Sequence, residues 1–265
     1  MEIDFKRITD ALEKRFDLEA RYYTRIKALI LEAFRRIMRA VPKNMSAARF
    51  TIDRCPTKRE IRKILECLYD RLCEEMEAIC EAVIRQREEC YGVTATIDAE
   101  DILAAEYGGK DTYDKIRAYR DNLADEFESW AVIMLHNKFT PEQTARLYSA
   151  NITMPYNNKL FNGASAIAGV SVMRVRLGAP HWGIGIYAAG YSSLNRMVRN
   201  VASNTARQTD WNIFSQSGVI GWEVVRGSSF PCEECDDNVG FHAAAFADLP
   251  PYHANCKCIA IPVTI

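Results

Sequence analysis

Hydrophobic residues recur every three or four positions over the first 151 residues, which is the spacing of amphipathic helices. The first apolar stripe includes Ile8 and Phe16 and continues as far as Met38. Pro42 has no amide hydrogen to donate, so we expect this helical stretch to end just before it. Turn-forming residues follow, and residues 43–56 are therefore predicted to be a connection.

A long helix is predicted next. Thr57 and Glu60 have the spacing of a capping box, in which each side chain satisfies a backbone amide at the helix start. Gly92 is expected to end the helix. At about 1.5 Å per residue it would be about 50 Å long, which suits a strut in a bundle or a surface that meets a partner. Its apolar residues alternate at steps of four and three, as in a coiled-coil seam; they are Ile61, Leu65, Leu68, Leu72, Met76, Ile79 and Val83.

Three further helices are predicted in the rest of the first 151 residues. Asp98 can cap a short one, which two consecutive glycines end. A longer one runs from about Thr112 to His136. Thr140 begins the last, because a proline at the first helical position and a capping-box residue, Gln143, follow it. The apolar stripe of the longer helix consists of Ile116, Tyr119, Leu123, Phe127, Trp130, Ile133 and Met134.

The pattern changes over residues 152–190, where glycine, proline and asparagine become frequent. The stretches 171–177 (SVMRVRL) and 181–187 (HWGIGIY) could form short strands, but the poor periodicity favours an irregular or partner-ordered segment. His181 lies in this segment without a second ligand nearby, and we interpret it as a structural or solvent-facing residue.

Regular structure is expected to return at Ser192 and Ser193, which are suited to cap a helix from Leu194 to about Ser217. After Gly218 the stretch VIGWEVVRG alternates between two faces and is predicted to be a strand. The last eight residues, CIAIPVTI, are predicted to be its partner strand. The stripe of the helix includes Met197, Val201, Asn204, Arg207, Gln208, Trp211 and Phe214.

These elements predict a mainly α-helical protein with a small α+β module towards its C-terminal end. The long helices would be followed by a helix and a β-hairpin that a zinc-knuckle-like turn closes. We expect a helical region over residues 1–151, an irregular connection over 152–190 and the small module over 191–265. A chain of 265 residues is long enough for one large domain or two modest ones.

Composition narrows the classes of protein to be considered. Hydrophobic residues make up 48% of the chain and charged residues 26%, as in folded soluble proteins. The formal net charge is −1, so the chain lacks the basic excess of proteins that coat nucleic acid. The N-terminal segment lacks the apolar core of a secretory signal, and no apolar run reaches the roughly 20 residues of a membrane span. We therefore expect a reducing compartment, in which stable disulfides are rare.

Nine cysteines then need another role. Those on or near the long helix lack histidine partners at metal-ligand spacing, and we interpret them as packing residues. They are Cys67, Cys73, Cys80 and Cys90.

The last part of the chain has the spacing of a metal site. Cys232 and Cys235 form a C-x-x-C pair, which lets two thiolates from one turn face the same ion. His253 and Cys256 form a second pair with the same offset. Together the two pairs would supply the Cys₃His set of a structural Zn²⁺ site. Cys258 points to the same strand face as Cys256 and could replace it or His253 as a ligand.

Other interpretations of these residues stay open. Reduced cysteines could simply pack inside a tight hairpin, and His242 is a further candidate ligand. A redox role is disfavoured because the C-x-x-C pair does not open a helix within a βαβ pattern. A catalytic zinc would need an open position and a general base, and the acidic residues at 233–237 are typical of a solvated turn. We therefore favour structural zinc.

The order of these motifs resembles the C-terminal signature of the phage Mu F-like minor head proteins, also called head morphogenesis proteins. In that signature a helix and a tryptophan-bearing strand precede C-x-x-C, a glycine, a proline-bearing turn and His-Pro-Asn-Cys-Arg-Cys. Ala254 and Lys257 depart from its proline and arginine, and Gln208-Thr209 replaces a threonine-glutamate step. The resemblance covers the last quarter to third of the chain and rests on residues 205–209, Trp222, Cys232–Cys235, Gly240, residues 249–251 and His253–Cys258.

This resemblance implies a minor structural protein of a tailed-phage head, not an enzyme. Such a protein would be assembled in the cytoplasm of the bacterial host and would lie at the portal vertex of the virion. It would bind portal and capsid proteins and act in head morphogenesis or genome delivery.

One alternative is a zinc-stabilised DNA-binding module. Arg196, Arg199 and Arg207 precede the metal motif, and Lys257 lies within it. These residues could meet the phosphates of phage DNA, although the acidic run at 233–237 opposes such contact.

A second alternative is a phage-encoded toxin, because members of this family are sometimes fused to domains such as ADP-ribosyltransferases. Glu126-Phe127-Glu128 is the E-x-E sequence that suggests this. It is predicted to lie in the middle of a helix, with no strand-borne Ser-Thr-Ser element before it, and acid pairs on helices are usually solvated. The toxin hypothesis is therefore the weaker of the two alternatives.

Overall fold

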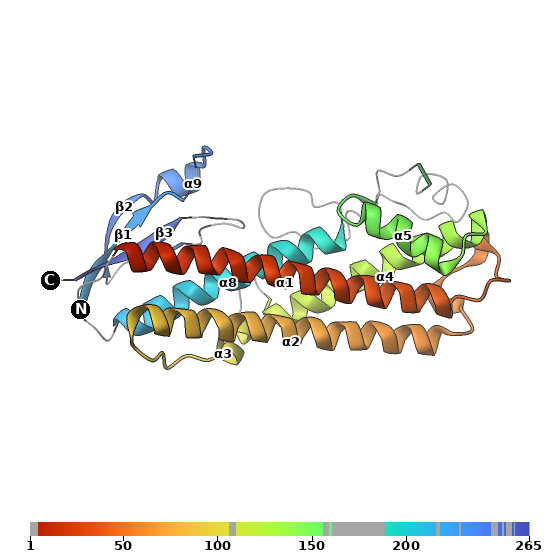
Figure 1. Ribbon diagram of the computed structural model, residues 1–265, viewed down its shortest axis with the longest axis horizontal. Helices are drawn as coiled ribbons and strands as arrows, with labels where there is room; N and C mark the ends of the chain where they lie inside the picture. Colours follow the sequence, from red (N-terminus) through yellow and green to blue (C-terminus); the bar gives the residue numbers. More distant parts are fainter. Residues whose placement is uncertain are drawn as a thin grey trace. The chain divides into compact units, whose positions relative to one another are not determined.

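The computed structural model describes residues 5–105, 110–155, 159–160, 189–215, 218–227, 229–244, 249–250, 252, 256 and 258–264 (Figure 1). Within these residues the protein is mainly helical, with a small antiparallel sheet towards its C-terminal end, which confirms the predicted fold class. The elements in chain order are α1 (Phe5–Ala40), η1 (Ala47–Arg49), η2 (Ile52–Arg54), α2 (Lys58–Tyr91), α3 (Ala99–Ala104), α4 (Thr112–Asn137), α5 (Pro141–Asn151), α8 (Gly190–Ser215), β1 (Val219–Val225), α9 (Glu233–Asp236), β2 (Gly240–Ala243) and β3 (Ile259–Thr264).

The chain divides into two compact units, each assembled from separated stretches of sequence. Helices α1, α2 and α8 contribute residues to both units. The sequence suggested consecutive regions 1–151, 152–190 and 191–265, and most of the middle one lies outside the described residues, so that division stays a prediction. The stretches are residues 1–23, 75–111 and 196–265 in unit 1, and residues 24–74 and 112–195 in unit 2.

Unit 2 is organised around an aromatic core that α1, α4 and α5 supply. Phe34 stacks on Tyr148 with ring centroids 4.1 Å apart. It also meets Phe127 and Trp130 edge-on, at 5.2 and 6.3 Å. All four rings are fully buried, and aromatic pairs of this kind contribute about 0.5–1.5 kcal/mol beyond their burial. The apolar stripe predicted for α4 is buried along its whole length, so that prediction is confirmed.

The starts of the helices test the predicted caps. Thr140 and Gln143 form the capping box at the start of α5, with hydrogen bonds of 3.1 and 2.8 Å. Asp98 caps α3 by accepting a 2.9 Å hydrogen bond from an amide in the first turn. The capping box expected at Thr57 is wrong, because the amide of Glu60 donates to the carbonyl of Thr57 at 2.9 Å, while the Thr57 hydroxyl donates to the carbonyl of Ala40 at 2.7 Å. That bond ties the start of α2 to the end of α1.

The long helix α2 follows the predicted pattern. Every residue of its predicted seam is buried. Gly92 follows its last residue with φ of 68°, a left-handed conformation that glycine adopts without strain. Cys73 and Cys80 are buried on this helix, as expected of packing residues. All nine cysteines belong to the described residues, and no two of them are joined by a disulfide.

Helix α8 begins earlier than predicted. It starts at Gly190, so Ser192 and Ser193 lie in its first turn and not at the cap. The carboxylate of Glu126 accepts a 3.3 Å hydrogen bond from the amide of Gly190. A residue of α4 therefore satisfies a backbone donor at the actual start of α8, whereas the sequence predicted that the helix starts four residues later, after a serine cap.

The apolar stripe predicted for α1 is wrong at Phe16. Phe16 is 44% exposed, whereas Arg15 and Glu19 are only 6% and 2% exposed. These two charged residues lie four positions apart, and such residues share one face of a helix. Trp211 of the stripe predicted for α8 is likewise 41% exposed. Unit 1 thus buries two charged residues outside the predicted stripe and exposes two aromatic residues that were predicted to be in a stripe.

The sheet of unit 1 has β1 in the centre, with β2 and β3 antiparallel on its two sides. The predicted pairing of β1 with the last strand is confirmed, and its register places Val225 opposite Ile259. Strand β2 was not predicted, since four residues are too few to show alternation. Trp222 of β1 is buried and meets Phe214 of α8 edge-on at 5.7 Å, beside the buried Leu249.

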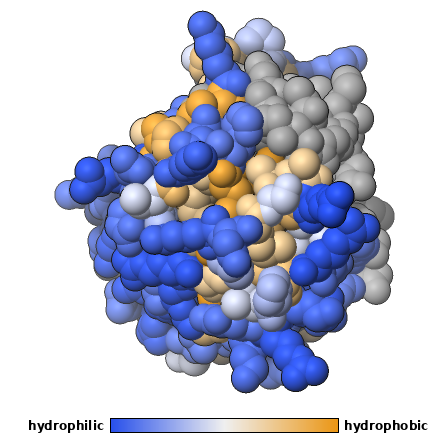
Figure 2. All heavy atoms as spheres, turned by 90° about the vertical axis from the view of Figure 1, so that its right-hand side faces the viewer, coloured by the Kyte–Doolittle hydropathy of each residue, from blue (hydrophilic) through white to orange (hydrophobic). Residues whose placement is uncertain are grey.

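The predictions on membrane spans and on the glycine-rich middle segment can also be compared with the structure. Among the described residues, no helix has the length and apolar character needed to cross a membrane. Figure 2 shows a face on which hydrophilic side chains predominate and smaller apolar areas lie between them. The stretches 171–177 and 181–187, including His181, lie outside the described residues.

Candidate metal centre

The register of the sheet brings the two cysteine motifs together. Val225 is the last residue of β1 and Ile259 the first of β3, and they are paired. Because the strands are antiparallel, the segment after β1 and the segment before β3 meet at the same end of the sheet. The thiols that converge there are those of Cys235, Cys256 and Cys258.

The spacing of these thiols fits a shared ion. All three Sγ atoms lie within 4.8 Å of one another, and those of Cys235 and Cys256 are 3.8 Å apart. Sulfur atoms bound to one tetrahedral Zn²⁺ at about 2.3 Å are separated by ~3.8 Å, whereas the two sulfur atoms of a disulfide are about 2.05 Å apart. The three thiols are therefore close enough to hold one metal ion, and Cys235 and Cys256 are too far apart for a disulfide.

The short helix α9 places Cys232 next to Cys235, although the Cys232 thiol does not belong to the group of three that lie within 4.8 Å of one another. Cys232 immediately precedes α9 and Cys235 lies within it, so one helical turn spans the C-x-x-C pair. The amide of Asp236 donates a 2.8 Å hydrogen bond to the carbonyl of Cys232. Arg226, which follows β1, contacts both the carboxylate of Asp236 and the carbonyl of Phe230. These contacts fold the connection back towards the start of β3.

The thiols change one another's ionisation. Burial raises the pKa of Cys235, and the adjacent side chains of Cys232, Cys258 and Cys256 raise it further. Burial also raises the pKa of Cys258. Thiolates held this close in a poorly solvated site repel one another, so Cys235 and Cys258 favour the protonated form. The positive charge of a bound cation would offset that repulsion. Thiols that bind a metal are therefore deprotonated.

Two histidines, His242 and His253, were considered as ligands. His253 lies outside the described residues, and its role as a ligand stays a prediction. His242 lies on β2, where its Nε2 is 2.9 Å from the carbonyl oxygen of Asn238. It does not belong to the group of converging ligand atoms among the described residues. The part of the site that the structure describes is therefore a set of thiols.

Comparison of the chain with protein-family models, with curated proteins and with solved structures finds no match. The resemblance to the phage Mu F-like proteins accordingly rests on the motif order alone.

The arginines of the DNA-binding hypothesis lie on α8 and have contacts within unit 1. Arg196 is only 4% exposed. Arg199 is 3.4 Å from the carboxylate of Glu19, and Arg207 donates a 2.8 Å hydrogen bond to an asparagine of the same helix. Lys257 lies outside the described residues. These guanidinium groups are thus engaged with the protein itself.

The two acids of the E-x-E sequence also have structural partners. Glu126 is fully buried and accepts the hydrogen bond from Gly190 at the start of α8. Glu128 accepts a 2.7 Å hydrogen bond from the amide of Ile52, the first residue of η2. Each carboxylate stabilises a backbone donor in unit 2, which accounts for both acids without a catalytic role.

A cluster of buried charges in unit 1 was missed in the sequence. Asp210 Oδ1 lies 3.4 Å from Nε of Arg87, and Glu19 pairs with Arg15 at 3.5 Å. Burial raises the pKa of Asp210 to about 6, although Arg87 and Arg15 lower it in part. Burial likewise raises the pKa of Glu19. The sequence signal was the charged pair at 15 and 19, which shares a helix face with buried apolar residues.

This charge cluster lies close to the metal centre. A cavity of about 30 Å³ is lined by Arg87 and Asp210 on one side and by Trp222 and Cys258 on another. Its volume suits roughly one water molecule. The thiol of Cys258 and the carboxylate of Asp210 therefore line one small cavity in unit 1.

Proposed function

We propose that the cysteines at the end of the sheet bind one structural Zn²⁺. The observation that carries this proposal is the convergence of three Sγ atoms within 4.8 Å of one another, with Cys232 beside them. Zinc prefers four tetrahedral ligands, and structural sites with four cysteines or with three cysteines and one histidine are both common. Cys232 would complete a Cys₄ site, and His253 in its place would complete a Cys₃His site.

The proposed role of the ion is to hold the ends of β1 and β3 together. The sheet is small, since β2 has four residues and β3 has six. A hairpin of this size builds little core of its own. Apparent binding free energies of about 10–16 kcal/mol are known for structural zinc in small peptides, so one ion can stabilise such a module.

For the protein as a whole, we propose a minor structural role in the head of a tailed phage, at the portal vertex. The support is the order of the C-terminal motifs, now joined to a sheet at whose end the motif cysteines meet. The burial of Arg196 and the ion pair of Arg199 with Glu19 disfavour direct contact of these arginines with DNA, so we propose portal and capsid proteins as the partners. The backbone contacts of Glu126 and Glu128 favour a role without catalysis.

Elemental analysis of the purified chain tests the metal site. We expect about one equivalent of zinc in the wild type and loss of zinc in Cys235→Ser and Cys256→Ser. Comparison of Cys232→Ser with His253→Ala identifies the fourth ligand, because only the variant that lacks it should lose zinc. Cys80→Ser, which alters a buried thiol of α2, is the matched control and should keep its zinc. Less than roughly half an equivalent in the wild type would contradict the site.

The proposed place in the virion is tested in bacteria that produce the phage encoding this chain. We expect the chain in purified heads, in few copies, and chemically cross-linked to the portal protein. Its absence from intact heads would refute the phage role and leave the zinc site untouched.

A further inference from the structure

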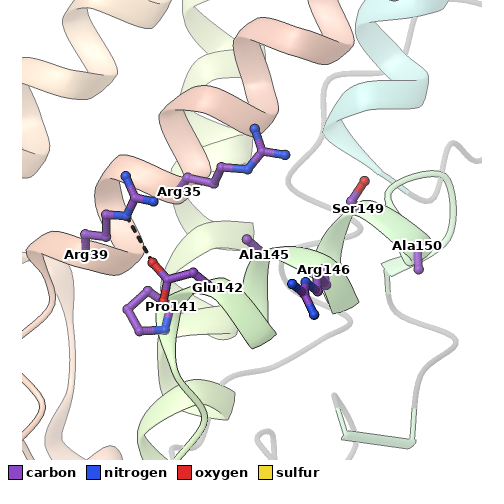
Figure 3. Close-up of a pocket in the computed structure, with 8 residues that line it drawn as sticks. All are labelled: Arg35, Arg39, Pro141, Glu142, Ala145, Arg146, Ser149 and Ala150. Atoms are coloured by element: carbon purple, nitrogen blue, oxygen red, sulfur yellow. Dashed lines mark hydrogen bonds and ion pairs between the residues drawn. The ribbon is translucent and has the colours of Figure 1, made fainter.

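A groove between α1 and α5 of unit 2 collects positive charge (Figure 3). Its volume is about 450 Å³. Arg35 and Arg39 extend into it from α1, and Arg146 belongs to its α5 wall. Glu142 supplies one carboxylate, whose Oε1 lies 3.3 Å from Nε of Arg39. Three arginines and one glutamate thus line the groove, in a chain whose formal net charge is −1.

The arginines of the groove are available to a partner. Arg35 and Arg146 are exposed, and within the part of the chain that the structure describes neither makes a hydrogen bond or an ion pair. Arg35 and Arg39 lie four residues apart, which is about 6 Å along the helix axis. A guanidinium group binds a carboxylate or a phosphate through two parallel hydrogen bonds. The groove therefore offers regularly spaced anion sites.

The ion pair already present shows how an anion is held there. The side chains of Arg39 and Glu142 are 63% and 58% exposed, so solvent screens their attraction and another anion can replace Glu142. A hydrogen bond from its own backbone and then the contact with Arg39 lower the pKa of Glu142, and the charge of Lys43 adds to this effect. Arg39 thus holds a carboxylate side chain in the geometry that a partner's carboxylate would adopt.

The other lining residues decide which kind of anion fits. Pro141, Ala145 and Ala150 give the groove a small apolar lining, and none of the described residues that line it is aromatic. Sites for single-stranded nucleic acid combine positive charge with aromatic rings on which the bases stack. An amphipathic partner helix needs instead a small apolar floor and charges at its own four-residue repeat. The lining of this groove matches the second case.

We infer that the groove binds an acidic helical segment of a partner protein. Two carboxylates four residues apart on that segment pair with Arg35 and Arg39, and a third acidic group pairs with Arg146. The groove lies entirely within unit 2, so this inference does not depend on the zinc site or on the phage role.

Fluorescence anisotropy with the full chain tests the inference. The probe is a labelled alanine-based peptide of 16 residues with glutamate at every fourth position. The comparison probes are the same peptide with lysine for glutamate and an oligothymidylate of equal negative charge. We expect the glutamate peptide to bind, more weakly as salt is added, and the other two to bind at least roughly tenfold more weakly. Failure of the glutamate peptide to bind, or tighter binding of the oligothymidylate, overturns the inference.

Charge reversal then locates the site. The double variant Arg35→Glu, Arg146→Glu should weaken peptide binding at least about tenfold, because hydrogen bonds to charged groups are lost. The matched control reverses Arg21 and Arg36, which are exposed on α1 but do not line the groove. An equal loss in this control would show only general attraction and would overturn the site.

Glu142→Gln should strengthen peptide binding, whereas charge reversal of the arginines should weaken it. Removal of the competing carboxylate should tighten peptide binding roughly two- to threefold, since an exposed ion pair competes weakly. Weaker binding in this variant would contradict the groove as the binding site. Far-ultraviolet circular dichroism of each variant checks that these exposed substitutions leave the helices intact.

Discussion

The two units of this protein bury different kinds of side chain. Unit 2 packs Phe34, Phe127, Trp130 and Tyr148 into one aromatic cluster. Unit 1 buries a network of arginines and carboxylates and gathers thiols at the end of its sheet. The first arrangement depends on shape and apolar area, whereas the second depends on the protonation of ionisable groups and, at the proposed metal site, on the ion that it would bind.

One chain can therefore combine a core whose stability depends little on pH and metal with a core whose stability depends strongly on both. Unit 2 also buries a carboxylate, that of Glu126, but a backbone amide at a helix start donates to it. In unit 1 the pKa of Asp210 is raised to about 6 although Arg87 lies beside it. Metal and pH should therefore act mainly on unit 1, and loss of aromatic packing mainly on unit 2.

The largest expected effect is that of metal removal. A chelator should destabilise the sheet of unit 1 by about 10 kcal/mol, the scale of structural zinc sites, and so open β1, β2 and β3. Amide hydrogen exchange should rise in these strands and stay slow in α4 and α5. Equal loss of protection in α4 would break the distinction between the two units. Readdition of zinc should restore the strands, which controls for irreversible damage.

Truncation of the aromatic core should come next. Phe34→Ala removes a fully buried ring that contacts three other aromatic side chains, and we expect a loss of about 3–5 kcal/mol in the free energy of unfolding. Urea denaturation measures the loss. Phe16→Ala, at an exposed position of the same helix, should lower it by less than about 1 kcal/mol. Similar losses for both variants would contradict the assignment of the core.

The pH dependence of unit 1 should be smaller but diagnostic. Because the pKa of Asp210 is raised from 3.8 to about 6 in the folded state, its contribution to stability is complete below about pH 4 and is lost as the pH rises through about 6. The wild type should therefore lose about 3 kcal/mol relative to Asp210→Asn between pH 4 and pH 7.

Urea denaturation of the wild type and of Asp210→Asn at several pH values gives the difference between their free energies of unfolding. The raised pKa of Glu19 acts in the same direction in both proteins and cancels in the comparison. A constant difference across this range would show that Asp210 does not titrate there.

The smallest of these effects should come from a helix cap in unit 2. Thr140→Ala removes the side chain that accepts from the amide of Gln143, and we expect a loss of about 1 kcal/mol. Thr140→Ser keeps the acceptor and should be nearly neutral. A melting temperature unchanged in Thr140→Ala would mean that α5 does not need its cap.

The sequence predicted the elements whose signals are local. The seam of α2 could be recognised because its apolar residues keep a regular spacing over many turns, and its burial followed. The capping box of Thr140 involves a residue only three positions away. The convergence of Cys235 with Cys256 could be anticipated because both flank strands that pair with each other.

The sequence failed where the partner is distant. The start of α8 depends on Glu126, which is 64 residues from Gly190, so no local pattern could reveal it. The burial of Arg15 and Glu19 could not be predicted from the local pattern, because Glu19 pairs with Arg199, which is 180 residues away in the sequence. The site likewise could not be specified beyond its thiols, since spacing alone does not decide between Cys258 and His253.

The interleaving of the two units has a consequence for synthesis on the ribosome. Unit 2 is complete once residue 195 has emerged, because all of its stretches precede that point. Unit 1 joins residues 1–23 and 75–111 with residues 196–265, so it is complete only after residues 196–265 have emerged. Contacts between such distant segments form slowly, and until then residues 1–23 lack the native neighbours that residues 196–265 supply. Folding of the nascent chain therefore begins in its middle.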